Sequence, residues 1–229
     1  MTPEPGIPTL RLSQDPQADA VLARSPFALL VGMVLDQRLP TNRAFAAPAM
    51  IIERIGCELD PAELAEYDSE QFAAVLGQPP AIHPSPVAIA ARIQRLAAHI
   101  TARYGADVTR MWTDHSTAEE VVRRFEQLPG FSKGKARVLL ALLGKQLGVT
   151  PAGWREAAAP YGAEGAHLSV ADVVDQASLE AVRSARRERK KAKKAALSRT
   201  SGHSKGGVAS VGRGNEQRIR ARAEPERRM

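Results

Sequence analysis

Apolar residues recur at three- and four-residue intervals along most of the chain between residues 16 and 182, which is the spacing of one helix face. One series is Ile89, Ile93, Leu96 and Ile100, and the later Gly105 is typical of a helix end. The same region shows no alternation of apolar and polar residues with hairpin turns between. The pattern therefore predicts an all-α fold of about eight to ten short helices, given ordinary helix lengths.

Four helix starts share one signature, a polar N-cap residue followed directly by proline. Proline fits the first helical position because the amide that it lacks has no partner inside the helix. The cap oxygen accepts hydrogen bonds from amides one turn further on. The four pairs are Asp15-Pro16, Ser25-Pro26, Asp60-Pro61 and Ser85-Pro86. Two further pairs, Asp60 with Glu63 and Ser116 with Glu119, have the spacing of a capping box.

The segment Phe27–Leu35 is apolar on every side. Such a segment is a helix buried all round or a short buried strand, and the Ser-Pro start favours the helix. A second helix is expected over Ala44–Ile55, kinked by Pro48 and ended by Gly56.

Charge divides the chain near Val182. Residues 183–229 hold 16 Lys and Arg against 4 Asp and Glu, whereas residues 1–182 hold 16 against 21. We therefore expect an N-terminal extension over residues 1–15, a helical domain over 16–182 and a basic tail over 183–229. Residues 183–196 could extend a helix, and the Ser-, Gly- and Arg-rich chain beyond Leu197 is expected to be disordered. A basic tail suggests a polyanion partner, and a solubilising extension is the alternative.

Several classes of protein are disfavoured. The chain has no run of 18 apolar residues and no secretory leader, so we expect no membrane span and a cytoplasmic protein. Its one cysteine, Cys57, cannot form an iron–sulfur cluster or a Cys-rich zinc site. The histidines are widely spaced, and no phosphate-binding or dinucleotide-binding glycine motif is present. We therefore expect no metal and no cofactor.

The most informative stretch is a turn between two apolar helices. It consists of Leu128, Pro129, Gly130, Phe131, Ser132, Lys133, Gly134 and Lys135. A turn of this kind places successive backbone amides at a helix start, where they form an anion site. Lys133, Lys135, Arg137 and Lys145 would add positive charge. A DNA phosphate suits such a site, which would position the duplex without reading its sequence.

This stretch resembles the helix–hairpin–helix of the HhH-GPD superfamily of base-excision DNA glycosylases, over residues 118–147 here. The segment from Ser25 to Gln37 resembles the opening helix of that family, and the spacing of about 90 residues between the two matches also suits it. The resemblance covers roughly residues 16–160. It implies an all-α fold that kinks DNA and flips a base into a cleft, because a stacked base is out of reach.

The resemblance also suggests residue roles. Gln37 would fill the gap left by the flipped base, or else it caps a buried helix. Glycine at position 134 replaces the nucleophilic lysine of the bifunctional members, so a lyase step is not expected. Lys133 and Lys135 flank that position and are assigned to phosphate binding rather than to chemistry.

The catalytic aspartate of the family has no match near Ala152. The nearest carboxylate is Glu156, while Asp36 would lie at the cleft mouth and Asp172 could return to it. Such a group would stabilise the positive charge that develops on the sugar.

Three interpretations remain open. The chain could be a monofunctional DNA N-glycosylase that removes a damaged base, in which case we expect a monomer that binds damaged double-stranded DNA in the nucleoid. Alternatively, it could be a DNA-binding module that has lost the chemistry. In the third interpretation, the hairpin is only a tight turn between helices.

Overall fold

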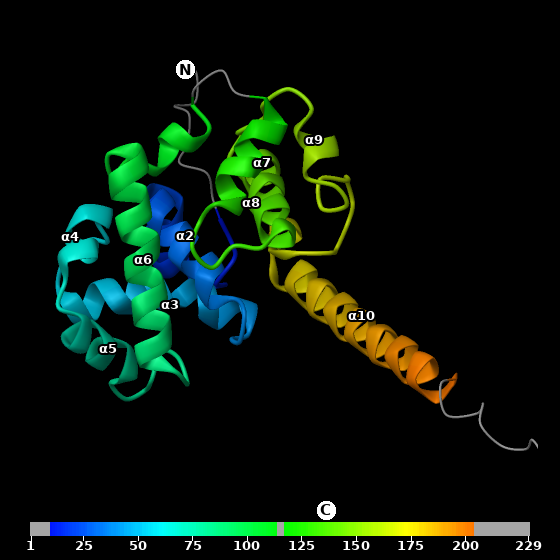
Figure 1. Cartoon of the computed structure of the whole chain (residues 1–229), viewed down its shortest axis with the longest axis horizontal. Coiled ribbons are helices and arrows are strands. Elements are labelled where there is room, and N and C mark those ends of the chain that lie inside the picture. Colours follow the sequence, from blue (N-terminus) through cyan, green and yellow to red (C-terminus); the bar gives the residue numbers. More distant parts are fainter. Residues whose placement is uncertain (1–9, 114–116, 204–229) are drawn as a thin grey trace, which may run out of the picture. The chain divides into compact units, whose positions relative to one another are not determined.

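The computed structural model describes residues 10–113 and 117–203. These residues contain ten α-helices, two short 3-10 helices and no strand (Figure 1), so the all-α prediction is confirmed. The contacts divide the chain into two compact units, Met1–Glu188 and Arg189–Met229. The expected capping residue Ser116, residues 1–9 of the expected extension and residues 204–229 of the expected tail lie outside the described residues.

The helices follow one another in this order: α1 (Pro16–Arg24), α2 (Pro26–Leu35), α3 (Thr41–Ile55), α4 (Pro61–Glu66), α5 (Ser69–Gly77), α6 (Pro86–Tyr104), η1 (Val108–Met111), α7 (Ala118–Glu126), α8 (Lys133–Gln146), α9 (Trp154–Ala157), η2 (Val170–Asp172) and α10 (Gln176–His203).

All four proline helix starts are confirmed. Pro16, Pro26, Pro61 and Pro86 are the first residues of α1, α2, α4 and α6. Three of the four preceding caps accept hydrogen bonds from first-turn amides. The exception is Ser85, whose side chain makes no cap hydrogen bond.

The capping box expected at Ser116 and Glu119 lies one residue further along. Thr117 is the N-cap of α7, and its hydroxyl accepts a hydrogen bond from the Glu120 amide. The Glu120 carboxylate in turn accepts one from the Thr117 amide, over 2.9 Å. Thr117 has the extended backbone of a cap, with φ −68° and ψ 159°, and this conformation fixes the register of the box.

The helix α2 is the centre of the core. Every residue from Phe27 to Leu35 is buried, so the helix prediction for this segment is confirmed. Gly32 permits α3 to come close, because a Cβ there would lie 2.8 Å from Cδ1 of Phe45. The helix α3 begins at Thr41, earlier than expected, contains Pro48, and ends at Gly56 with φ +77°.

Two groups of helices meet around α2. On one side α6 packs against α4 and α5, and on the other α8 packs against α7, α9 and η2 (Figure 1). The 3-10 helix η1 contacts α2, α6 and α7 and so connects the two groups. This arrangement brings the turn before α8 close to the end of α2.

The expected domain boundaries fall inside structured segments. Leu10 and Leu12 of the expected N-terminal extension are buried in the core. The expected start of the tail, Arg183, lies inside α10, and its guanidinium donates to Oδ1 of Asn42. The helix continues because α10 is rich in alanine, lysine and arginine, which are good helix formers, and Leu179 and Val182 anchor its first turns in the core.

Candidate nucleic-acid interface

The turn between α7 and α8 is a short, internally bonded hairpin. The Phe131 amide donates to the carbonyl oxygen of Leu128 over 3.0 Å, and Gly130 has φ +87°, which favours glycine. Leu128 is buried and anchors the turn. Pro129, Gly130 and Phe131 are partly exposed, so the turn presents its backbone at the surface.

The start of α8 carries the expected positive charge. Ser132 is the N-cap, and its hydroxyl accepts a hydrogen bond from the Lys135 amide over 3.3 Å. The earlier amides, of Lys133 and Gly134, belong to the first helical turn, where the helix itself offers no acceptor. The Lys133 and Arg137 side chains are exposed beside them. This end of α8 therefore combines open amides, the positive end of the helix dipole and two exposed cations.

Gln37 connects the hairpin to α6. Its Nε2 donates to the carbonyl oxygen of Gly130 over 3.1 Å, and its Oε1 accepts from Nη1 of Arg92 over 2.6 Å. The aliphatic part of Arg92 lies against Gly130, where a Cβ would come within 2.8 Å of the Arg92 Cδ. Gln37 does not cap α2 in this arrangement. It lies exposed between two elements that are far apart in sequence.

Lys135 points inward rather than toward solvent. Its Nζ donates to the carbonyl oxygen of Met33 over 2.7 Å and lies 5.4 Å from the centre of the Phe131 ring. The pKa of Lys135 is lowered from 10.5 to about 8, chiefly by burial; Asp36 opposes this change and Arg92 contributes to it. Lys135 therefore fastens the start of α8 to the end of α2 and is poorly placed to bind a phosphate in solvent.

Asp36 lies at the end of α2, as expected, but its charge is already paired. Arg186 of α10 contacts both carboxylate oxygens, over 2.9 and 3.2 Å. The Asp36 side chain is only 12% exposed. A pair of this geometry directs both carboxylate oxygens toward Arg186.

Glu156 lies elsewhere, on the four-residue helix α9, and is exposed. The anchor of that helix is Trp154, which packs so closely on α8 that a Cβ on Gly144 would lie 2.5 Å from its ring. The Arg155 guanidinium lies over the same ring at 4.4 Å. The Tyr161 hydroxyl lies near the start of α8, 3.9 Å from the place of a Cβ on Gly134. Trp154 is thus a packing residue, while Tyr161 is close to the hairpin.

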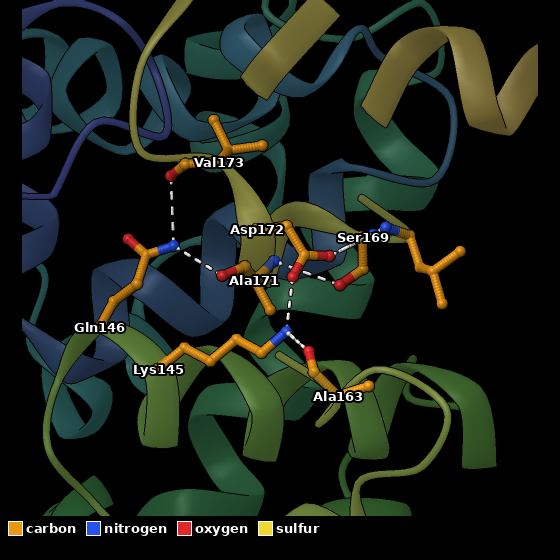
Figure 2. Close-up of polar contacts among 8 residues, drawn as sticks. Lys145, Gln146, Ala163, Ser169, Ala171, Asp172 and Val173 are labelled. Atoms are coloured by element: carbon orange, nitrogen blue, oxygen red, sulfur yellow. Dashed lines mark hydrogen bonds and ion pairs between the residues drawn. The ribbon is translucent and has the colours of Figure 1, made fainter. Parts of the chain in front are cut away.

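Asp172 and Lys145 form a separate, buried cluster (Figure 2). The Lys145 Nζ lies 2.6 Å from Oδ1 of Asp172 and donates to the carbonyl oxygen of Ala163 over 2.7 Å. The other Asp172 oxygen accepts from the amides of Leu168 and Ser169. The Lys145 side chain is 16% exposed and the Asp172 side chain is 4% exposed.

This cluster corrects the expectation that Lys145 adds positive charge to the hairpin. Lys145 lies at the far end of α8, and its charge neutralises Asp172 inside the fold. Next to it, Gln146 donates to the carbonyl oxygens of Ala171 and Val173 (Figure 2). Together the two side chains hold the segment 163–173 against α8.

The structure therefore joins Gln37 to the hairpin by a hydrogen bond and places Asp36 next to Gln37 in the chain, whereas Glu156 lies on α9, without a hydrogen bond to either among the described residues. Two residues of this region carried no signal in the sequence. Arg92 lies in an ordinary amphipathic helix, and Arg186 lies in a run of basic residues that suggests a solvated tail. Only contacts between distant segments reveal their roles.

Within the described part of the chain, no three His, Cys, Asp or Glu residues cluster in a way that could hold a metal ion. No single helix there is long and apolar enough to cross a membrane, and the pair α1 and α2, bent by 118°, meets the length and composition criteria only when taken together.

Comparisons with protein-family models, curated proteins and solved structures found no match.

Proposed function

We propose that this protein binds double-stranded DNA through the turn between α7 and α8. The observation that carries the proposal is the start of α8, where first-turn amides, a partly exposed Gly130 backbone and the exposed cations Lys133 and Arg137 occur together. A phosphate diester satisfies all of these groups at once, because amides and cations both favour an anion at a helix start.

Two further cations extend this surface. Arg92 is joined to the hairpin through Gln37, and Arg38 follows Gln37 directly in the chain. A row of positive side chains along neighbouring elements suits the regular spacing of phosphates on a duplex. The contacts are to the backbone, so the proposed binding depends strongly on salt and weakly on sequence.

A fluorescence anisotropy titration of a labelled duplex, repeated at several salt concentrations, tests this function. Lys133→Gln is expected to weaken binding and to reduce the slope of log affinity against log salt by about one. Arg103→Gln is the matched control, because Arg103 is an exposed cation in the last turn of α6. Equal affinity and slope in the two variants would exclude the hairpin as the DNA contact.

The basic segment 189–229 is proposed to add affinity without specificity. It holds 13 Lys and Arg against 3 Asp and Glu. A chain ending at residue 188 keeps Arg183 and Arg186, which contact the helical unit. We expect a flatter salt dependence from this chain, and an unchanged slope would show that the segment does not contact DNA.

A second candidate function is removal of a damaged base by N-glycosidic hydrolysis. One observation favours it, namely that Lys135, at the junction of α2 and the hairpin, has a lowered pKa and interacts electrostatically with the carboxylate of Asp36. Perturbed groups of this kind are enriched at active sites. Incubation with duplexes that carry alkylated, oxidised, deaminated or mismatched bases, with mass spectrometry of the supernatant, tests it. A released base establishes a glycosylase, and DNA binding without release favours a binding module.

A further inference from the structure

A cavity of about 220 Å³ lies beside the Gln37 and Arg92 contact, and both of these residues line it. Its polar lining comes from the chain after α2 and from the start of α6. Besides Gln37, it consists of Arg38, His83, Ser85 and Arg92. No carboxylate is among the lining residues, so the cavity carries two full positive charges and no negative one.

His83 offers a hydrogen-bond donor to this cavity. The residue is 5% exposed, and its Nδ1 accepts a hydrogen bond from the Ser85 amide over 3.0 Å. Because Nδ1 is an acceptor, the proton of the neutral ring lies on Nε2. The structure gives Nε2 no hydrogen-bond partner among the described residues, and because His83 lines the cavity this N–H can donate to a ligand there.

The start of α6 adds more donors at the same place. Ser85 is the N-cap of this 19-residue helix, yet its hydroxyl makes no cap hydrogen bond. Pro86 has no amide hydrogen, and the next amides, of Val87 and Ala88, belong to the first turn and lack intrahelical acceptors. Both Ser85 and Ala88 line the cavity. An N-cap serine that leaves first-turn amides open suits an anion that accepts from them instead.

Burial and the neighbouring positive charges favour the neutral ring of His83. Burial lowers the pKa of His83, the hydrogen bond from Ser85 opposes the change, and Arg38 and Arg92 lower it further. The ring is thus neutral near pH 7, with its proton on Nε2, and it lines the same cavity as the two guanidinium groups.

We propose that this cavity binds a phosphate group, held by Arg38 and Arg92, by Nε2–H of His83 and by the Ser85 hydroxyl at the start of α6. A phosphate has enough acceptor oxygens to satisfy these donors together, and guanidinium groups match its geometry. The phosphate belongs either to a DNA backbone, in which case the site rests on the proposed function and supplies a second contact, or to a free phosphate or nucleotide.

Long-range ¹H–¹⁵N NMR of the histidine rings in the full chain tests the proposal, with the His83 signals assigned from a His83→Gln spectrum. One arm adds inorganic phosphate and the other adds a short duplex, each against sodium chloride of equal ionic strength. We expect saturable movement of the His83 signals. Arg38→Gln is expected to weaken the effect about tenfold. Arg95→Gln, an exposed cation of α6 that does not line the cavity, is expected to leave it unchanged.

Ser85→Ala separates a binding role from a structural one. Because the Ser85 hydroxyl makes no cap bond, its loss is expected to leave the melting temperature without phosphate nearly unchanged. The same variant is expected to weaken phosphate binding several-fold. A lower melting temperature with unchanged phosphate affinity would show a helix cap and would overturn the assignment of this residue to a ligand.

The two arms identify the source of the phosphate. A shift with inorganic phosphate alone assigns a free phosphate or a nucleotide, and a shift with the duplex that Arg38→Gln weakens assigns the DNA backbone. If the His83 signals move in neither arm, or move equally in the wild type and in Arg38→Gln, the cavity is not a phosphate site. If the duplex does not bind in the anisotropy titration but inorganic phosphate still shifts the His83 signals, the proposed DNA binding is wrong and the phosphate site is supported.

Discussion

Arg186 holds the carboxylate of Asp36 at both oxygens, over 2.9 Å from Nη2 and 3.2 Å from Nη1, and its Nη1 also donates to the Thr41 hydroxyl over 3.0 Å. This one side chain ties the first half of α10 to the end of α2 and the start of α3. Asp36 is one of the carboxylates expected to act, and this contact occupies both of its oxygens. Any chemistry assigned to Asp36 therefore depends on Arg186.

Replacing Arg186 by Gln is expected to lower the free energy of unfolding by about 1–3 kcal/mol, because Asp36 becomes a largely buried charge with a weaker partner. The lower part of this range reflects the 37% exposure of Arg186, which lets water screen the pair. Urea denaturation measures the change. Arg187→Gln removes an exposed neighbouring cation that donates to the Ser184 hydroxyl, and it serves as the control. Equal stability of the two variants would show that the pair contributes nothing.

Lys135 gives a second prediction, in the alkaline range. Its pKa is about 8 in the folded chain against 10.5 ordinarily, so the unfolded chain binds more protons between these values. The wild type is expected to gain on the order of 1–3 kcal/mol of stability as pH rises from about 8 to 10.5. Lys135→Met should remove this gain while keeping the side-chain volume. Parallel stability curves for the two proteins over this pH range would contradict the assignment.

Gly130 gives a third prediction, because two effects coincide there. Alanine must adopt φ +87°, and its Cβ would lie 2.8 Å from Cδ of Arg92. Gly148→Ala is a matched control, since Gly148 has φ +69° with nothing within 4 Å. Both variants should lose about 1–2 kcal/mol from the backbone, but only Gly130→Ala should also weaken duplex binding. Fluorescence anisotropy and denaturation of both variants check this. Equal DNA affinity of the two variants would show that the hairpin is not part of the DNA-binding surface.

Asp172 gives a fourth prediction, which concerns stability alone. Asp172→Asn leaves the Lys145 ammonium without a compensating charge in a largely buried place, and a loss of about 2–4 kcal/mol is expected. Glu164→Gln, an exposed carboxylate in the same segment, should change stability little. DNA affinity measured below the unfolding range should stay unchanged. A loss of affinity in the folded variant would place Asp172 in the interface after all.

Local signals in the sequence predicted local structure well. The prolines at residues 16, 26, 61 and 86 begin helices, and the apolar segment Phe27–Leu35 is the buried helix at the centre. These predictions succeed because caps, proline and periodicity act within a few residues. The capping box at α7 was wrong by one residue, since Ser116 and Thr117 are both good caps and only the backbone geometry distinguishes them.

Pairings between distant residues could not be predicted. Gln37 and Gly130 are 93 positions apart, and Asp36 and Arg186 are 150 apart. Which basic residue meets which carboxylate depends on how the helices pack, and a single sequence contains no direct record of that. For the same reason Lys145 was assigned to the wrong surface, although its helix was expected.

The packing of Trp154 against Gly144 gives the protein its own optical reporter. The chain has only two tryptophans, so Trp112→Phe would leave Trp154 as the sole source of indole emission. Its ring is enclosed by α8 and covered by Arg155, and its emission will change when α9 leaves α8. Because the ring packs on Gly144 near the end of α8, its fluorescence can follow the packing of α9 on that end of the helix during titrations without any attached dye.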